Sequence, residues 1–397
     1  MLLAGTGIAT VPGQASAVTT VGCGAVILAS VTLTADIGPC ATGNGINIGK
    51  SGITLSLAGH TITGNNTGNK TDNPQLGVNL MNVKNVTVQN GTITGFDAGV
   101  SITGGGGNTI QGLVVKNNIA HVLLTGGVDP KNPEATHCDF GDGITTDNSN
   151  SNLIQFNEAF NNGPFSGISL VDASGYNKVL NNNAHDNNVS NIMPDGFTSG
   201  PCGPFGAVLV GQGRAHQDVG IRVEGPGATH NTVGENRATN NQLEGIAVHG
   251  NTCHPPNPNF PPGLPNDSNL IRGNTVTGNG FVDTSDGIGI LSQGPSGIVC
   301  VANNNTITGN TSNGNGGNGI FVGGRNSTGN QVLQNTANGN GVDGIHLNSG
   351  AHNASIKRNK ASGNGRYDGF DGNLMPPCDA NVWFLNTFAV VNQPCVH

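Results

Sequence analysis

The chain has 397 residues, of which 65 are glycine, 4% are aromatic and 10% carry a charge. The formal net charge is -8 with only 15 lysine and arginine residues, which excludes the basic surface that nucleic-acid binding needs. The hydrophobic fraction of 35% lies at alternating positions of short segments, and this pattern excludes a disordered chain.

Residues 1–17 predict a secretory signal peptide. They are apolar and end in the small residues Ala15, Ser16 and Ala17, although the usual basic residues before the apolar run are missing. No later stretch is long and apolar enough to span a membrane. We therefore expect a secreted, extracellular and monomeric protein without a membrane partner, in which residues 18–44 form an N-terminal cap.

A glycine followed by an apolar residue, most often isoleucine, recurs along the chain. The shortest spacings between these glycines are 22 to 25 residues, and longer spacings contain inserts. A second pattern, Asn-x-Ile/Val-x-x-Asn, keeps register with the first, as in Asn330 to Asn335. Both patterns accompany short alternating segments that predict β-strands. The glycine series is Gly45, Gly77, Gly99, Gly143, Gly167, Gly220, Gly245, Gly287, Gly319, Gly344 and Gly369.

A period of this length is typical of leucine-rich repeats and of parallel β-solenoids. The chain is too poor in leucine and helix-forming residues for the first, whereas its glycine and asparagine favour tight turns. In a solenoid, equivalent asparagines stack at about 4.8 Å, where their amides bond to one another. The sequence predicts an all-β, single-stranded right-handed parallel β-helix over residues 45–372, with about eleven to twelve coils and a C-terminal cap at 373–397.

Two early segments, GINIGKSGITLSLAGHTITG at residues 45–64 and VKNVTVQNGTITGF at residues 83–96, carry a family resemblance. They resemble the amino-terminal coils of secreted bacterial right-handed parallel β-helix proteins of the pectate-lyase-like class. That resemblance implies a polysaccharide lyase, a glycoside hydrolase, a uronate epimerase or a protein without assigned activity. The Asp-Pro-His-Asp motif of alginate epimerases and the paired-Asp motif of polygalacturonases are absent from this sequence.

Four inserts interrupt the period, near residues 125–141, 189–217, 250–268 and 292–302. The first two precede a Gly-Ile strand and the last two follow one. We therefore expect the inserts to wall a groove over these strands, between about Gly143 and Leu291.

The eight cysteines lie in the expected caps and inserts. Two pairs are each 17 residues apart and are expected to pin the caps, while each insert holds one cysteine. The predicted disulfides are Cys23–Cys40, Cys378–Cys395, Cys138–Cys202 and Cys253–Cys300.

A carboxylate precedes the glycine in several periods, at Asp142, Glu244, Asp286, Asp343 and Asp368. Because side chains of this kind stabilise turns, we favour a structural role for the series as a whole. Asp142, Glu244 and Asp286 lie where the groove is expected, and they are candidates for substrate binding.

Alternation along the strands places Arg222 and Glu224 on the outer face, and the same count places Asp147 and His249 there. Stacked coils would bring Glu224 to about 5 Å from His249 and about 10 Å from Asp147. These four residues are the catalytic candidates. Two further candidates for substrate binding are Asp172, which would lie beside them, and His216, which borders the longest insert.

Three hypotheses follow from these residues. In the first, an exported enzyme acts on a uronate-containing glycan by β-elimination or epimerisation, with Arg222 neutralising the carboxylate and His249 or Glu224 removing the proton. In the second, Asp147 and Glu224 catalyse inverting hydrolysis, which needs carboxylates about 6.5 to 9.5 Å apart. In the third, the protein is a non-catalytic surface or matrix protein that either binds a polysaccharide in its groove or serves as a durable structural spacer. The acidic cluster suggests Ca²⁺ as the one possible cofactor, and no zinc-type spacing occurs.

Overall fold

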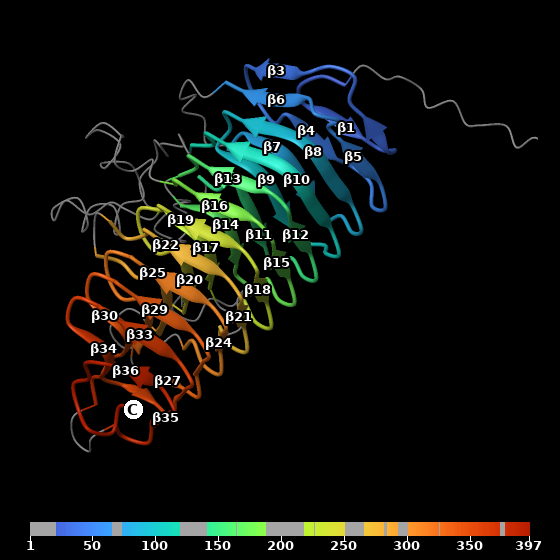
Figure 1. The fold of residues 1–397 in the computed structure, drawn as a ribbon. Helices are drawn as coiled ribbons and strands as arrows, with labels where there is room; N and C mark the ends of the chain where they lie inside the picture. The colour runs from blue at the N-terminus through green and yellow to red at the C-terminus, as the bar shows by residue number, and fades with distance from the viewer. Residues whose placement is uncertain are drawn as a thin grey trace, which may run out of the picture.

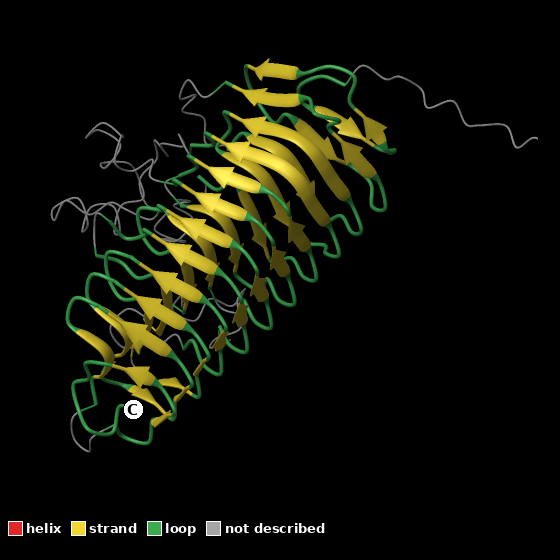
Figure 2. Ribbon diagram, in the orientation of Figure 1, coloured by secondary structure: helices red, strands yellow, loops and turns green. Residues whose placement is uncertain are grey.

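The computed structural model describes residues 21–65, 74–119, 141–163, 165–187, 218–225, 227–250, 266–281, 284–292, 301–324, 326–373 and 378–397. Within these ranges the regular elements are all β-strands, and they form the coils of a right-handed parallel β-helix (Figure 2). The colour in Figure 1 runs steadily from blue at one end to red at the other, so the chain advances coil by coil along one axis.

Three stacks of parallel strands form the faces of the helix. The first stack, which we call the Gly-Ile sheet, has twelve strands, in agreement with the predicted number of coils. These are β1 (Ala25–Ile27), β4 (Ile46–Ile48), β7 (Leu76–Met81), β9 (Ala98–Thr103), β11 (Ile144–Asp147), β14 (Ser166–Val171), β17 (Val219–Glu224), β20 (Ile246–His249), β23 (Ile288–Ser292), β26 (Ile320–Gly324), β30 (Asp343–Leu347) and β34 (Tyr367–Asp371).

The other two stacks share the long strands β8 (Thr87–Thr94) and β10 (Thr109–Lys116), which run through both. The second stack also contains β2 (Val31–Thr32), β5 (Thr54–Ser56), β12 (Leu153–Gln155), β15 (Lys178–Leu180), β18 (Thr232–Gly234), β21 (Leu270–Arg272), β24 (Thr306–Thr308), β28 (Gln331–Leu333), β32 (Ser355–Lys357) and β35 (Val382–Phe384). The third contains β3 (Ile37–Cys40), β6 (Thr61–Gly64), β13 (Glu158–Phe160), β16 (Asn183–His185), β19 (Arg237–Thr239), β22 (Thr275–Thr277), β25 (Thr311–Asn313), β29 (Thr336–Asn338), β33 (Lys360–Ser362) and β36 (Thr387–Phe388). A short separate pair joins β27 (Ser327–Thr328) to β31 (Ala351–His352).

Each coil buries apolar side chains from all three of its strands. In the coil of β20, Ile246, Val248, Ile271 and Val276 are fully buried, and each such side chain stabilises the fold by about 1.5 to 3 kcal/mol. The glycine that opens the coil is required by the same packing. A Cβ at Gly245 would lie 2.4 Å from Val276 Cγ1, so any larger residue would collide with the core.

Asparagine side chains stack in three ladders at the turns between the strands. The two ladders expected from the Asn-x-Ile/Val-x-x-Asn pattern are confirmed, and a third runs between the third stack and the Gly-Ile sheet. In each ladder the amide Nδ2 of one coil donates to the amide oxygen of the next, for example Asn152 to Asn177 at 2.9 Å, Asn157 to Asn182 at 3.0 Å and Asn187 to Asn241 at 2.9 Å. These buried amides are therefore satisfied by their own repeats.

Both predicted cap disulfides are confirmed. Cys23 pairs with Cys40, with their Cα atoms 5.5 Å apart, and Cys378 pairs with Cys395 at 6.3 Å. The first of these disulfides closes the first coil, because Cys23 precedes β1 and Cys40 ends β3.

The register of the last coil differs from the prediction that aligned Asp368 with Asp343. The partner of Asp343 is Tyr367, and Gly369 pairs with Ile345 instead of Gly344. The asparagine ladder explains the shift. Asn340 bonds to Asn364 across 24 residues, so the coil is one residue shorter than the glycine spacing implies.

The four expected inserts fall largely on residues outside the described ranges. Their cysteines, Cys138, Cys202, Cys253 and Cys300, lie outside them, as does His216. The predicted signal peptide lies outside the described residues too. In the part of the chain that is described, no helix is long and apolar enough to cross a membrane.

Candidate functional site

Three ionisable side chains on the outer face of the Gly-Ile sheet are almost completely buried. Arg222 and Glu224 of β17 are 4% and 5% exposed, and His249 of β20 is 7% exposed. Outward residues of a sheet normally face water, and burying charged groups is costly unless they are paired. Contacts with neighbouring side chains must therefore offset the cost of burying these three groups.

Three of the four catalytic candidates, Asp147, Glu224 and His249, lie in one column, and Arg222 lies in another. Asp147 pairs with Val171, Val171 with Glu224, and Glu224 with His249, so this column runs through four successive coils in register. Glu224 and His249 are adjacent, whereas Val171 separates Asp147 from Glu224. The structure thus brings together Glu224 and His249 and leaves Asp147 two coils away.

Arg222 is held from several sides. Its guanidinium lies 4.3 Å above the ring of Phe165, its Nε donates to Ser166 Oγ at 3.2 Å, and it forms an ion pair with Glu224. The contacts with Phe165 and Ser166 were not predicted. The alternation of inward and outward side chains along one strand does not indicate which residues of the neighbouring coil they contact. Glu224 is consequently the counter-ion of Arg222.

Glu244 and His249 form a second pair beside the first. Glu244 Oε1 lies 3.5 Å from His249 Nε2, which is an ion-pair contact too long for a strong hydrogen bond. Among the described residues, Glu244 Oε2 and His249 Nδ1 are buried without a hydrogen-bond partner. Burial opposes ionisation of Glu244, but His249 and the positive charge of Arg222 outweigh it, so the pKa of Glu244 lies below its usual value.

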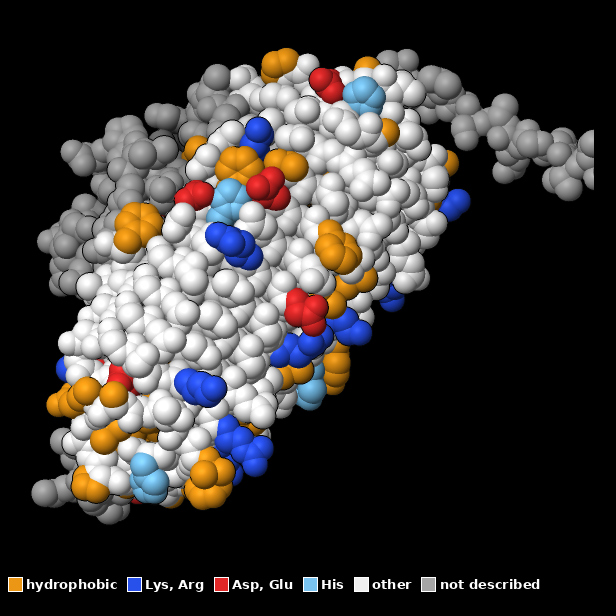
Figure 3. Space-filling view, in the orientation of Figure 1, with side chains coloured by type: hydrophobic (Ala, Val, Ile, Leu, Met, Phe, Trp, Pro, Cys, Tyr) orange, Lys and Arg blue, Asp and Glu red, His pale blue; other side chains and the backbone are white. Residues whose placement is uncertain are grey.

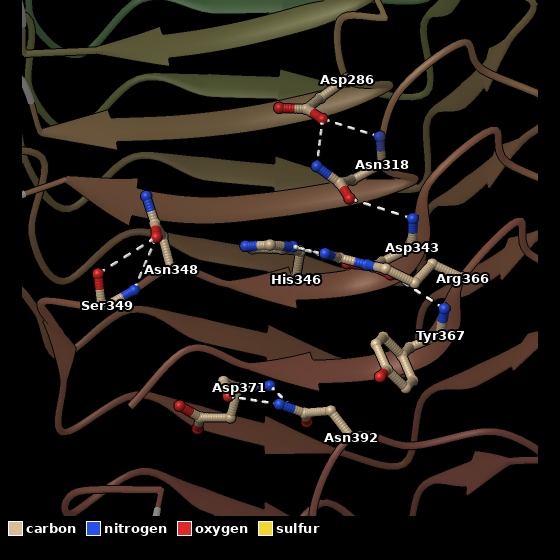
Figure 4. A network of polar contacts seen from close by, with 10 residues as sticks. All are labelled: Asp286, Asn318, Asp343, His346, Asn348, Ser349, Arg366, Tyr367, Asp371 and Asn392. Carbon is tan, nitrogen blue, oxygen red and sulfur yellow. Dashed lines mark hydrogen bonds and ion pairs between the residues drawn. The ribbon is translucent and has the colours of Figure 1, made fainter. Parts of the chain in front are cut away.

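Asp286 lies one coil further along, in register with Glu244. Burial and the negative charge of Glu244 raise the pKa of Asp286 to about 7, although Asn318 opposes the rise. The Asn318 backbone N–H donates to Asp286 Oδ1 at 2.8 Å and its side-chain amide donates at 2.7 Å (Figure 4). Two neighbouring carboxylates with pKa values displaced in opposite directions are the usual arrangement of an acid and a base.

A glycine lies between these groups. A Cβ at Gly289 of β23 would be 3.6 Å from Glu244 Cγ and 3.8 Å from His249 Nε2. Arg222 pairs with Ala247 of the next coil, and Ala247 pairs with Gly289 of the coil after that. The two coils that follow Arg222 therefore have small residues at its position. Gly289 was not predicted, although a glycine at an outward strand position is a signal that could have revealed it.

The remaining candidates lie apart from this cluster. Asp142 is fully buried three coils before Glu244 in the same row. Asp172 begins the turn after β14 with a φ of 47°, and its backbone N–H donates to the Glu224 carbonyl at 3.0 Å. We call the buried residues Arg222, Glu224, Glu244 and His249, together with the half-buried Asp286, the buried charged cluster.

Within the described residues, no group of three or more His, Cys, Asp or Glu side chains has the geometry to hold a metal ion.

Comparisons with known proteins agree with the architecture. Residues 39–184 and 77–256 match the family described as "Right handed beta helix region", and together these matches span more than half of the chain. No curated protein sequence matches.

Similar solved structures include three β-helix proteins. The Dettilon tailspike protein gp208 is 19% identical, with a TM-score of 0.51 and coverage of 93% of this chain and 61% of that chain. A double mutant of the periplasmic alginate epimerase AlgG is 13% identical, with a TM-score of 0.50 and coverage of 88% and 77%. The A-module of the Azotobacter vinelandii mannuronan C-5 epimerase AlgE4 is 16% identical, with a TM-score of 0.49 and coverage of 94% and 88%. At these identities the likeness to the tailspike protein and to AlgG shows the fold alone.

Proposed function

The chain belongs to the family of right-handed β-helix proteins, and on its buried charged cluster we propose that it is an enzyme acting on a uronate-containing polysaccharide. The observation that carries the proposal is a pair of buried atoms, Glu244 Oε2 and His249 Nδ1, that have no hydrogen-bond partner among the described residues and lie next to a buried arginine. Perturbed and incompletely satisfied ionisable groups concentrate at functional sites, because stability alone does not favour them.

The proposed reaction starts with removal of the proton next to the uronate carboxylate. Arg222 carries five N–H donors, so it can bind a substrate carboxylate beside Glu224 and withdraw charge from the reacting carbon. His249 Nδ1 accepts the proton, and Glu244 stabilises the imidazolium that results. A positioned base of this kind typically contributes about 10² to 10⁴-fold in rate.

Asp286 completes the reaction as the acid. A carboxyl with a pKa of about 7 is partly protonated at neutral pH and can deliver its proton to the leaving glycosidic oxygen as that carbon–oxygen bond breaks and the sugar double bond forms. In an epimerisation Asp286 instead delivers its proton to the carbanion, from the face opposite His249, and the glycosidic bond stays intact. Both outcomes use the same three groups, and they differ in whether the glycosidic bond is cleaved.

The test is a panel of pectate, alginate and glycosaminoglycans incubated with the full chain, with and without Ca²⁺. Elimination appears as ultraviolet absorbance of unsaturated uronate, and epimerisation appears as solvent deuterium incorporated at the reacting carbon. His249→Gln should abolish either signal. Wild-type protein that is silent on the whole panel would refute the proposed activity.

A second candidate function is glycoside hydrolysis. It is favoured by the opposite pKa displacements of Glu244 and Asp286 on adjacent coils, which differ from the pair Asp147 and Glu224 predicted for this reaction. Reducing ends that appear without ultraviolet absorbance would establish hydrolysis in place of elimination. Glycan binding without any product would instead support the non-catalytic hypothesis.

We also propose that the protein is exported. The disulfides Cys23–Cys40 and Cys378–Cys395 are typical of oxidising compartments, and the apolar residues 1–17 supply a candidate signal. Expression with and without these residues, followed by assay of the culture medium, tests the proposal. Secretion that persists after their deletion would contradict the assigned signal.

A further inference from the structure

Aromatic side chains line up on the Gly-Ile sheet immediately beyond the buried charged cluster. Phe321 of β26, His346 of β30 and Phe370 of β34 are in register, with ring centroids 5.3 Å and 4.5 Å apart. Tyr367 lies beside Phe370, with centroids 5.6 Å apart. We call these four residues the aromatic strip.

Core packing does not explain the aromatic strip. Its rings point outward and are partly exposed, while Ile320 and Val322 fill the interior of the same coil. The equivalent row holds Thr145 and Ser169 in earlier coils, where the hydroxyls hydrogen-bond at 2.8 Å. The chain has only 13 Phe, two Tyr and one Trp, so three of these 16 residues clustered on one outer face require a reason outside the core.

A buried carboxylate fixes the strip in place. Asp343 Oδ2 lies 2.7 Å from His346 Nδ1, Asp343 Oδ1 accepts from Arg366 Nε at 3.0 Å, and Asp343 Oδ1 also accepts from the Tyr367 backbone N–H at 3.0 Å (Figure 4). The Arg366 guanidinium lies 4.5 Å from the centroid of Phe370 and 5.5 Å from that of Tyr367. The rings and the cation are therefore held rigidly before any ligand binds, which lowers the entropic cost of binding.

We propose that the aromatic strip and Arg366 form a second binding subsite, which holds uronate residues of the same polysaccharide next to those at the buried charged cluster. The inference rests on the proposed function for its ligand. It adds a location, coils β26 to β34, that lies beyond the predicted groove.

Continuity with the charged cluster supports this position. Phe321 pairs with Gly289, the residue that lies between Glu244 and His249, so the strip begins one coil beyond the reacting groups. Coils repeat at about 4.8 Å, and an extended polysaccharide chain that lies along the helix axis would contact one coil after another.

The chemistry of the strip selects the ligand. Aromatic surfaces bind the C–H faces of sugar rings by apolar contact, and Arg366 attracts a carboxylate. Its side chain is 47% exposed although it is bound to Asp343. Basic residues are scarce in this chain, with only 15 lysine and arginine residues in 397. The position of an accessible arginine among aromatic rings therefore favours a polyuronate over a neutral glycan as the ligand.

Binding, measured separately from turnover, tests the subsite. We would measure dissociation constants for oligogalacturonate, oligomannuronate and a neutral galacto-oligosaccharide by calorimetry, using the full chain carrying His249→Gln to prevent turnover. Adding Phe370→Leu or Arg366→Gln should weaken binding of whichever oligouronate binds by about tenfold or more. In the active protein, the same changes should raise KM more than they lower kcat.

Phe160→Leu is the matched control. Phe160 stacks on His185 with centroids 5.0 Å apart, but it belongs to the third stack, on the face that Figure 3 shows. Its substitution should leave the affinity unchanged. Affinity that survives both Phe370→Leu and Arg366→Gln in folded protein, or wild-type protein that binds neither oligouronate, would overturn the subsite. Strip-dependent binding without turnover would overturn the enzymatic proposal alone.

Discussion

The Gly-Ile sheet carries two pairs of a carboxylate and a histidine, and they differ in how completely the carboxylate is satisfied. Asp343 contacts His346 and Arg366 and accepts from the Tyr367 backbone, so both of its oxygens have partners. Glu244 contacts His249 at 3.5 Å, and its Oε2 has no hydrogen-bond partner among the described residues. The two carboxylates occupy the same row of the repeat.

Under the proposed function, this difference separates a structural pair, Asp343 and His346, from a reactive pair, Glu244 and His249. A carboxylate with every oxygen satisfied stabilises the fold and has little capacity to change partners during a reaction. An unsatisfied buried carboxylate next to a histidine costs stability, so its presence points to a function. The following experiments test that distinction, beginning with the largest expected effect.

Removing the imidazole of the reactive pair should abolish turnover. His249→Gln takes away the proposed base, and we expect kcat to fall by about 10² to 10⁴-fold while the unfolding temperature changes little. His352→Gln is the control, because His352 pairs with Asp379 near the C-terminal cap. Wild-type turnover by folded His249→Gln protein would contradict the assignment of the base.

Neutralising the two carboxylates should have opposite effects on stability and activity. Asp343→Asn leaves Arg366 and His346 without their ion-pair partner, and we expect the free energy of unfolding to fall by about 1 to 3 kcal/mol. Glu244→Gln should change stability much less and should lose turnover. Denaturant unfolding of both variants measures this, and equal destabilisation would remove the distinction between the two pairs.

The pH dependence of stability should reveal Asp286. Its pKa is about 7 in the folded chain and near the model-peptide value of 3.8 when unfolded, so the folded state binds more protons between these values. The stabilisation is complete below about pH 4 and is lost as the pH rises through about 7. Asp286→Asn should flatten this fall relative to wild type in unfolding experiments. Parallel pH profiles would show that Asp286 ionises normally.

The smallest expected effect is that of Gly289→Ala. The new methyl would make ordinary contacts of 3.6 to 3.8 Å, so the fold should tolerate it, while activity should drop several-fold because the methyl lies between Glu244 and His249. Gly319→Ala is the contrasting variant, since its Cβ would lie 2.6 Å from Asn340 Nδ2 and should destabilise the coil. Unchanged turnover of Gly289→Ala would place the reaction elsewhere.

The sequence by itself determined the repeat and the direction of its side chains. Each coil packs against a coil of the same kind, so the same positions need the same residues in every repeat. The glycine that packs against the next coil and the asparagine that bonds to its equivalent there therefore recur periodically in the sequence. Alternation then assigned Glu224 and His249 to the outer face and to adjacent coils. The cap disulfides were predictable because their short spacing left few geometric alternatives.

Only the tertiary structure decided which of these groups interact. Alternation along a strand does not say that Arg222 bonds to Ser166 of the preceding coil, that Glu244 approaches His249, or how far either is buried. The raised pKa of Asp286 likewise depends on burial and on the charge of Glu244, a residue one coil away in space and distant in sequence. Electrostatic interactions act through space, so the partners that make a buried charge stable or reactive are set by how the coils stack.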